Sequence, residues 1–349
     1  MINISIIIPT CNRADQLFAT LNSLMEIEFD TSKFEIIVVD NGSEDNTKEI
    51  VENFIAKFPE HHIHYFYDAI PGLLTGRHRG AKEAFGNILV FIDDDIEADR
   101  NWLTSIAEAF LNPDVHLVGG KSLPKYEVHP PDWLENFWKN DAVGKRCPWL
   151  SLLDLGEVSK QIDPIFVWGL NFSIRKKTLY DLGGFHPDNV PSDLQYLQGD
   201  GETGLSQKMR ALEFKAMYVP GALVYHVIPN ERLTFGYFEK RAFYQGVCAS
   251  YSEIRKAGKV IPQNDQVQKK DFTDEYKKKQ TRFDIFSLLK NKKNIDSQKN
   301  FDDLLARTKK SYFGGYQYHQ QAVKNNPELL EWVTRKDYFN YNVPIIKKQ

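Results

Sequence analysis

Three consecutive aspartates, Asp93, Asp94 and Asp95, stand directly after the apolar run Ile88–Ile92. Such a run is typical of a buried strand. Ionised carboxylates this close repel one another, at about 1 kcal/mol per pair in water and about 4 kcal/mol at an effective dielectric near 20. A fold relieves the repulsion by leaving the acids in water, by protonating one of them, or by supplying a cation. A solvated turn that caps a helix is the plain alternative.

A second acidic stretch, Gly199–Glu202 (GDGE), lies directly before a predicted helix over Gly204–Leu212. It contributes two carboxylates, Asp200 and Glu202, in a glycine-rich turn. The N-terminus of a helix carries partial positive charge, so the helix dipole favours the ionised form of both acids. Capping of the helix is the structural alternative to a chemical role for these residues.

Alternating strands and helices are predicted over the first hundred residues. The predicted strands are the apolar runs Ile4–Ile8, Glu35–Val39, His62–Phe66 and Ile88–Ile92. The predicted helices, with apolar residues at helical spacing, are Ala14–Met25, Thr47–Phe58 and Arg79–Phe85. This alternation predicts an α/β fold with a right-handed, mostly parallel central sheet flanked by helices.

The rest of the chain has a different pattern. The middle is predicted to combine short strands with loops, the strands being Val115–Val118, Phe166–Trp168, Ala216–Val219 and Ala222–Tyr225. Leu123–Leu155, rich in Pro, Trp and charge, reads as a long loop or insertion in which Trp133 and Trp138 staple the loop or line a cleft. After Leu233 the pattern becomes helical. We therefore predict a domain over residues 1–235 and a mainly helical extension over residues 236–349.

Polar residues follow the predicted strands at one edge of the sheet. They are Pro9, Thr10 and Arg13 after the first strand, Asp40 and Asn41 after the second, and the three aspartates after the fourth. Ligands of an open α/β sheet bind outside the carboxyl ends of its strands. Carboxylates are hard oxygen ligands for Mg²⁺ or Mn²⁺, and such a cation would bridge them to a diphosphate. The first strand is followed by neither GxGxxG nor a Walker A lysine motif, so dinucleotide and P-loop sites are excluded.

Composition narrows the classes of function. The net charge of -3 carries no nucleic-acid signature. The three cysteines are odd in number and far apart, which argues against a disulfide framework and favours a reducing, cytoplasmic compartment. The first residues do not read as a signal peptide, and the apolar runs are shorter than a membrane span. Residues 255–310 hold 16 Lys and Arg against 8 Asp and Glu, including a lysine run at 277–279. This basic region is a solvated helix face or a contact with an anionic membrane surface.

Three stretches together resemble the inverting glycosyltransferases of family 2. They are SIIIPTCNRADQL, EIIVVDNGSEDNT and PGLLTGRHRGAKEAFGNILVFIDDD, and their order and spacing match through about residue 230. The resemblance implies a GT-A fold, with a nucleotide-sugar-binding half over residues 1–100 and an acceptor half over residues 101–235. It also implies a nucleotide-sugar donor, most commonly a UDP-sugar, and a bound Mn²⁺ or Mg²⁺.

The resemblance assigns roles on the donor side. Asp93–Asp95 matches the family's Asp-x-Asp motif, which implies that Asp95 binds the metal and that Asp93 lies towards the ribose or the metal. The positions that match nucleotide-sugar-binding residues of the family are Pro9, Thr10, Arg13, Asp40, Asn41, Arg77, Asp93 and Asp94. Arg77 matches an arginine that lies beside the diphosphate and the acids.

On the acceptor side, the resemblance places the catalytic base at Glu202, where many members have Asp, and Asp200 is the competing position. His226 matches a place where a histidine can bind the metal or diphosphate, although a packed histidine is an equal alternative. The segment that contains Trp168 and Asn171 resembles the acceptor-side strand, and Trp168 would stack on a sugar or belong to the core.

The predicted function is therefore a metal-assisted single displacement that moves a sugar from a nucleotide-diphosphate sugar to a hydroxyl group. The acceptor would be a glycan, a lipid-linked molecule or a protein, as in the building of a surface polysaccharide. Two alternatives stay open at this point: a sugar nucleotidyltransferase and a non-catalytic sugar-binding relative. For the residues after 235, three roles stay open: packing on the acceptor half, peripheral contact with the inner face of a membrane, and pairing of two subunits in a homodimer.

Overall fold

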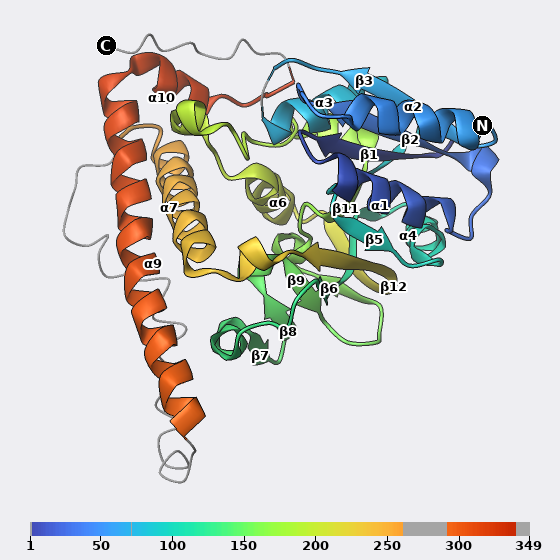
Figure 1. Ribbon diagram of the computed structural model, residues 1–349. Helices are drawn as coiled ribbons and strands as arrows, with labels where there is room; N and C mark the ends of the chain where they lie inside the picture. The colour runs from blue at the N-terminus through green and yellow to red at the C-terminus, as the bar shows by residue number, and fades with distance from the viewer. Residues whose placement is uncertain (1, 71, 261–291, 340–349) are drawn as a thin grey trace.

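The computed structural model describes residues 2–70, 72–260 and 292–339, and a mixed sheet of twelve strands lies at its centre (Figure 1). The strands are β1 Ile4–Thr10, β2 Phe34–Asp40, β3 His62–Tyr67, β4 Ile88–Ile92, β5 Ile96–Ala98, β6 Val115–Tyr126, β7 Lys139–Asp141, β8 Gly144–Cys147, β9 Leu152–Asp154, β10 Lys160–Ile162, β11 Asn171–Arg175 and β12 Lys215–Ile228. The α-helices are α1 Ala14–Met25, α2 Thr47–Lys57, α3 Leu73–Glu83, α4 Trp102–Ala109, α5 Lys176–Asp181, α6 Gly201–Ala211, α7 Phe235–Ala257, α9 Lys292–Asn325 and α10 Pro327–Thr334.

The N-terminal strands form the parallel part of the sheet, in the order β3-β2-β1-β4. Every residue of β1 and β2 is buried, as their continuous apolar runs predict. Alternate side chains of β1 face opposite layers: Ile6 and Ile8 pack with α1 and α2, whereas Ile7 packs with α3. The predicted layers of this half, a parallel sheet flanked by helices, are confirmed.

The helix predicted over Arg79–Phe85 begins earlier, at Leu73. Gly72, with φ at +115°, turns the chain into the helix. Gly76 lets the helix lie against the ends of β1 and β2, because a Cβ there would be 2.3 Å from Asn41 Oδ1 and 2.8 Å from Pro9 Cβ. The longer helix carries Arg77 to the polar edge of the sheet.

The sheet is antiparallel where residues 101–235 join the parallel strands, because β11 lies antiparallel to both β4 and β6. The strand predicted over Phe166–Trp168 is wrong. Asp163 accepts a hydrogen bond from Ile165 N and opens a 3₁₀ turn at that point, and the strand begins only at Asn171. The two strands predicted within 216–225 are one, β12, which pairs in parallel with β6 across an irregularity.

The stretch Leu123–Leu155, predicted to be a loop, is largely structured. β6 extends to Tyr126, and β7, β8 and β9 add an antiparallel edge to the sheet. Trp133 is 7% exposed and packs with Phe137 and Phe238. Trp133 therefore packs in the core and fastens this stretch to it, which is one of the two roles predicted for Trp133.

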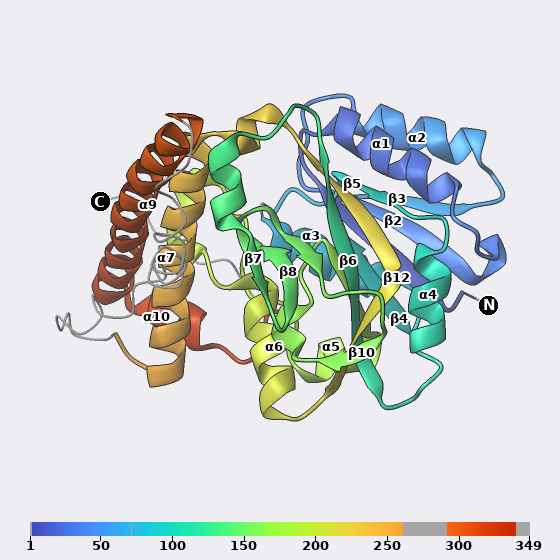
Figure 2. The same cartoon turned by 90° about the horizontal axis from the view of Figure 1, so that it is seen from below.

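The helices after residue 235 pack on the acceptor half, and α7 and α9 lie side by side in both views (Figures 1 and 2). Tyr251, Trp332 and Tyr338 share one buried cluster with Ile7 of β1 and Phe91 of β4. The predicted boundary near 235 coincides with the start of α7. Among the described residues, no helix is both long enough and apolar enough to span a membrane.

Candidate functional site

The polar ends of the N-terminal strands meet at one edge, as the sequence predicts. Thr10 ends β1 and pairs in register with Asp40, which ends β2. The hydroxyl of Thr10 donates to Asp94 Oδ2 at 2.7 Å, which joins the end of β1 to the acids after β4. Both Thr10 and Asp94 are 4% exposed, so the contact is made away from water.

Asp40 and Asn41 are held in fixed orientations. Asp40 accepts from Ser43 N at 2.8 Å and from the hydroxyl of Tyr65 at 2.8 Å. The Asn41 amide nitrogen donates to Thr75 Oγ1 at 3.2 Å on α3. The two side chains therefore form an ordered polar wall beside the aspartates. Pro9, also predicted here, contributes only a buried apolar side chain against α3.

Asp94 and Asp95 share one arginine. Arg13 contacts Asp94 Oδ1 at 3.0 Å through Nη1 and Asp95 Oδ2 at 2.7 Å through Nη2. Burial raises the pKa of Asp94 to about 7 despite the attraction of Arg13 and the hydrogen bond from Thr10. Asp95 contacts Arg13 at 2.7 Å and Arg232 at 2.6 Å, and the two guanidinium groups favour its ionised form. The repulsion among the three aspartates is thus relieved in two ways. The pKa of Asp94 is raised, and positively charged side chains contact Asp95.

Asp95 and His226 form a pair whose chemistry suits a divalent cation. His226 Nε2 lies 3.5 Å from Asp95 Oδ1, and that buried oxygen has no hydrogen-bond partner. A carboxylate oxygen and an imidazole nitrogen are ligands of Mn²⁺, and a Mg²⁺ or Mn²⁺ ion completes its shell with water and substrate phosphate.

Asp93, Asp95 and His226, the predicted metal ligands, do not gather into one cluster in the described part of the chain. The described residues hold no group of three or more His, Cys, Asp or Glu arranged around a metal position. The ion pair of Asp93 is instead with Arg77, whose Nη2 lies 3.7 Å from its Oδ1. The carboxylate of Asp93 is drawn towards this arginine, so the residues that fit a cation are Asp95 and His226.

Glu202 lies in the first turn of α6 and faces Arg77. Its Oε1 accepts from the backbone nitrogen of Gly169 at 3.1 Å, and its Oε2 lies 3.5 Å from Arg77 Nη1. Arg77 is 3% exposed, and its guanidinium bridges Asp93 after β4 and Glu202 of α6. The side chain of Glu202 is 22% exposed, which leaves room for a second molecule to reach it.

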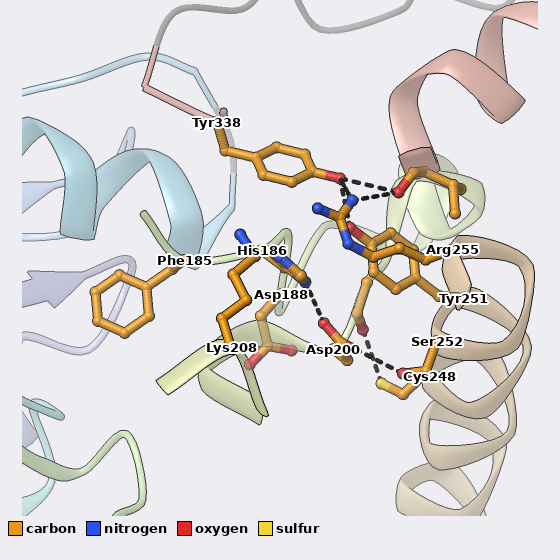
Figure 3. A network of polar contacts seen from close by, with 12 residues as sticks. Phe185, His186, Asp188, Asp200, Lys208, Cys248, Tyr251, Ser252, Arg255 and Tyr338 are labelled. Carbon is orange, nitrogen blue, oxygen red and sulfur yellow. Dashed lines mark hydrogen bonds and ion pairs between the residues drawn. The ribbon is translucent and has the colours of Figure 1, made fainter. Parts of the chain in front are cut away.

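Asp200, the competing prediction for the catalytic base, has both carboxylate oxygens bonded to other side chains of the protein (Figure 3). Its two oxygens contact His186 Nδ1 at 2.5 Å and Ser252 Oγ at 2.6 Å, and Ser252 belongs to α7. Burial opposes the charge of Asp200, but His186 and Ser252 outweigh it and lower its pKa. With both oxygens bonded inside the protein, Asp200 ties the start of α6 to α7, and Glu202 is the more accessible of the two predicted base positions.

Of the two predicted acceptor-side residues, Asn171 is buried within the sheet. It is 3% exposed, accepts from the Trp102 indole at 3.1 Å and donates to Ala222 O at 2.8 Å. These bonds hold the sheet together and leave no group for a substrate. Trp168 is partly buried, packs against the core and donates its indole N–H to Ile165 O at 3.1 Å.

Two residues of the site have no signal in the sequence. Arg232 donates to Asp95 Oδ2 at 2.6 Å from a position 137 residues later in the chain, in the turn after β12. Tyr65 of β3 orients Asp40 through its hydroxyl. Arg232 lies in an ordinary turn sequence, and Tyr65 in a strand where an aromatic residue is expected, so only the fold reveals their partners.

Comparisons with known proteins agree with this geometry. A profile described as Glycosyl transferase family 2 matches residues 5–183, about half of the chain. Glycosyltransferase AglE of Haloferax volcanii is 35% identical over 117 residues, which cover 34% of this chain and 38% of that protein. Validoxylamine A glucosyltransferase of Streptomyces hygroscopicus is 27% identical over 202 residues, which cover 53% of this chain and 47% of that protein. The matched parts thus span less than half the length of these relatives.

Among solved structures, a mannosyltransferase of Pyrobaculum calidifontis in complex with GDP-Man and Mn²⁺ has a similar fold. It superposes with a TM-score of 0.53 over 93% of this chain and 86% of its own, at 17% sequence identity. The predicted fold, a GT-A sheet with a helical C-terminal region, is confirmed by this likeness and by the element order. With the family profile matched over half of its length, the chain belongs to glycosyltransferase family 2.

Proposed function

We propose that this chain is a metal-assisted, inverting glycosyltransferase that moves a sugar from a UDP-sugar to a hydroxyl group of an acceptor. The observation that carries the proposal is the bridge made by Arg77. It lies 3.7 Å from Asp93 at the donor edge and 3.5 Å from Glu202 at the start of α6. A carboxylate available for proton transfer is thereby fixed beside the place proposed for the diphosphate.

The donor would lie along the polar edge. Asp40, Asn41 and Thr10 would hold the nucleoside, and Arg13 and Arg77 would attract the diphosphate. Asp95 and His226 would hold Mn²⁺ or Mg²⁺, and a divalent cation here neutralises charge on the leaving diphosphate. These roles are supported by the buried, pre-oriented side chains, which lose little freedom when a ligand binds.

Glu202 would act as general base. As the acceptor oxygen attacks the anomeric carbon, the carboxylate takes its proton and the bond from that carbon to the diphosphate oxygen breaks. Attack from the face opposite the leaving group inverts the anomeric centre. The hydrogen bond from Gly169 and the contact with Arg77 orient Glu202 for this step.

The acceptor class stays broad: a glycan, a lipid-linked molecule or a protein. We propose a cytoplasmic enzyme that reaches the inner face of a membrane through its basic region, whose lysine run at 277–279 lies outside the described residues. UDP is the first donor nucleotide to test. GDP is the second, since the solved mannosyltransferase with a similar fold is bound to GDP-Man.

The test is calorimetry of UDP binding to the full chain, with Mn²⁺ and then with EDTA. We expect micromolar binding to the wild type with Mn²⁺, and a loss of at least about tenfold with EDTA or in Asp95→Ala, a range typical of altered metal ligation. Asp181→Ala is the matched control, because it removes a surface aspartate paired with Lys177. If UDP, GDP and dTDP all fail to bind, the proposed donor site is wrong.

A further inference from the structure

The guanidinium of Arg232 contacts both side chains that the proposed function assigns to the cation. Its Nη2 donates to Asp95 Oδ2 at 2.6 Å, and its Nη1 lies 2.7 Å from His226 Nε2. The side chain of Arg232 is 21% exposed, whereas those of Asp95 and His226 are 2% and 4% exposed. The partly exposed Arg232 thus covers the buried side chains of Asp95 and His226, and its guanidinium can move towards solvent.

The hydrogen bonds of His226 determine which ring nitrogen carries the proton. Nδ1 lies 2.9 Å from the carbonyl oxygen of Leu150, and a carbonyl only accepts, so Nδ1 is the donor. Arg232 only donates, so Nε2 accepts and presents a lone pair. A histidine that binds a metal is commonly held in this way, with its other ring nitrogen bonded to a backbone carbonyl.

Two acceptor atoms therefore face each other. The lone pair of His226 Nε2 lies 3.5 Å from Asp95 Oδ1, and that oxygen has no hydrogen-bond partner among the residues that the structure describes. A cation between them would satisfy both atoms. However, the same lone pair cannot accept an N–H from Arg232 and bind a metal at once. Cation binding at this pair requires Arg232 to release His226.

We propose that Arg232 is a built-in competitor for the divalent cation, so that the cation binds only by displacing its guanidinium from Asp95 and His226. The inference rests on the proposed function, since it takes these two residues as the cation-binding pair. Displacement leaves two positive charges close together, which is unfavourable until an anion arrives. The diphosphate of the donor supplies that anion, so cation and donor bind cooperatively.

The test is Mn²⁺ binding to the full chain, followed by electron paramagnetic resonance of the free ion, with and without UDP. Arg232→Ala removes the competitor. We expect it to bind Mn²⁺ alone about tenfold more tightly, the factor given by a guanidinium that occupies the pair about nine-tenths of the time. The strengthening of Mn²⁺ binding by UDP should shrink by a similar factor.

Two further variants sharpen the comparison. Arg232→Lys, whose single ammonium group cannot contact both atoms in the same planar geometry, should bind Mn²⁺ with an affinity between those of the wild type and Arg232→Ala. It also keeps the test valid if the alanine variant does not fold. Arg210→Ala removes a surface arginine paired with Asp163 and should bind Mn²⁺ like the wild type.

The outcomes separate this inference from the function on which it rests. If Asp95→Ala and the wild type bind Mn²⁺ equally in the presence of UDP, the proposed cation site is wrong and the inference falls with it. If Asp95→Ala abolishes binding but both Arg232 variants leave the affinity for Mn²⁺ alone unchanged or weaker, the cation site stands and the competition is overturned.

Discussion

The acids of the site differ in what surrounds them, although three of them are neighbours in the chain. Asp93 faces Arg77, Asp94 is bonded to Thr10 and Arg13, and Asp95 is enclosed by cations. One residue type therefore supplies three electrostatic environments within three positions. Because each of the three aspartates has different partners, substitutions at Asp93, Asp94 and Asp95 should have different effects.

Glu202→Gln is the sharpest test at this scale. The amide keeps an oxygen that can accept from Gly169 N, so the local fold should survive, but it cannot take a proton. We expect sugar transfer to fall by about 10²–10⁴-fold, the contribution typical of a general base. UDP binding should change little, because the amide oxygen can still contact Arg77, which the proposal assigns to the diphosphate.

Steady-state kinetics with calorimetry on the same preparation checks this prediction. Asp200→Asn is the informative comparison, because it disturbs the bonds to His186 and Ser252 and should lower the melting temperature. Retention of wild-type turnover by Glu202→Gln would remove Glu202 from the mechanism.

The sequence predicts the strand-end residues of the site better than their partners. Thr10, Asp40 and the aspartates follow apolar runs whose ends must meet in a parallel sheet. Asp200 and Glu202 could not be separated in this way, since both are acids at the start of one helix. What separates them is their surroundings in the fold: Asp200 points to Ser252 of α7 (Figure 3), whereas Glu202 contacts Arg77.

At the scale of elements, the site depends on how closely the loop before β11 approaches α3. Gly169 lies in that loop, and a Cβ there would stand 2.2 Å from Arg77 Nη2. Arg77 is buried among Phe185, Asp93 and Glu202, so it has little space into which to retreat. The lack of a side chain at Gly169 is therefore a condition for the Arg77 bridge.

Gly169→Ala should displace the guanidinium while leaving the sheet intact. We expect turnover to fall by about 10–100-fold, because a shift of about 1 Å in a positioning group can cost this much. The melting temperature should fall modestly, because the buried guanidinium must shift to make room for the added Cβ. Kinetics and thermal melts of Gly169→Ala check this, with Gly236→Ala as the control, since a Cβ at Gly236 would meet no described atom within 4 Å beyond its chain neighbours and its own helix backbone. Equal turnover in the two variants would contradict the prediction.

Element types were easier to predict than the positions where elements begin. The buried strands of the parallel sheet are plain from their apolar runs, and α1 begins and ends where its apolar spacing predicts. The strand after Asp163 was misplaced by five residues, because a local turn outweighs the strand preference of Phe166–Trp168. The antiparallel edge β7–β9 was missed since its strands are only three or four residues long.

At the scale of the whole molecule, residues near the end of the described chain complete the first half of the fold. His78 of α3 donates through Nδ1 to Tyr338 O at 3.1 Å and accepts through Nε2 from Phe185 N at 3.0 Å. Phe339 stacks on His78 on one side and on Tyr180 on the other. The segment around Tyr338 is thus part of the core that supports Arg77, which lies one residue before His78.

This packing predicts a dependence of stability on pH. Burial lowers the pKa of His78 to about 3, so the folded protein holds it neutral, whereas an unfolded histidine titrates near 6.5. Its contribution is present above pH 6.5 and is lost as the pH falls towards 3. At pH 5 the loss is about 2 kcal/mol.

Denaturant unfolding at pH 7.5 and pH 5 measures this loss. His78→Gln has a side chain that both donates and accepts but does not titrate, so it should lose about 2 kcal/mol less than the wild type between the two pH values. The other buried histidines of the described residues, His186, His226 and His319, are unchanged in both proteins, and their contribution cancels in the comparison. An equal loss in both proteins would show that His78 does not titrate with unfolding.

The contact between His78 and Tyr338 spans 260 residues of sequence. A ribosome builds the chain from its N-terminus, so the strands and helices of the donor edge emerge long before the residues that complete their packing. Until residue 339 has left the exit tunnel, α3 lacks the backbone partner and the aromatic cover of His78. The sheet and helices of residues 1–100 therefore stay incompletely packed until that point. A chaperone would find the exposed apolar surface on α3 and α5.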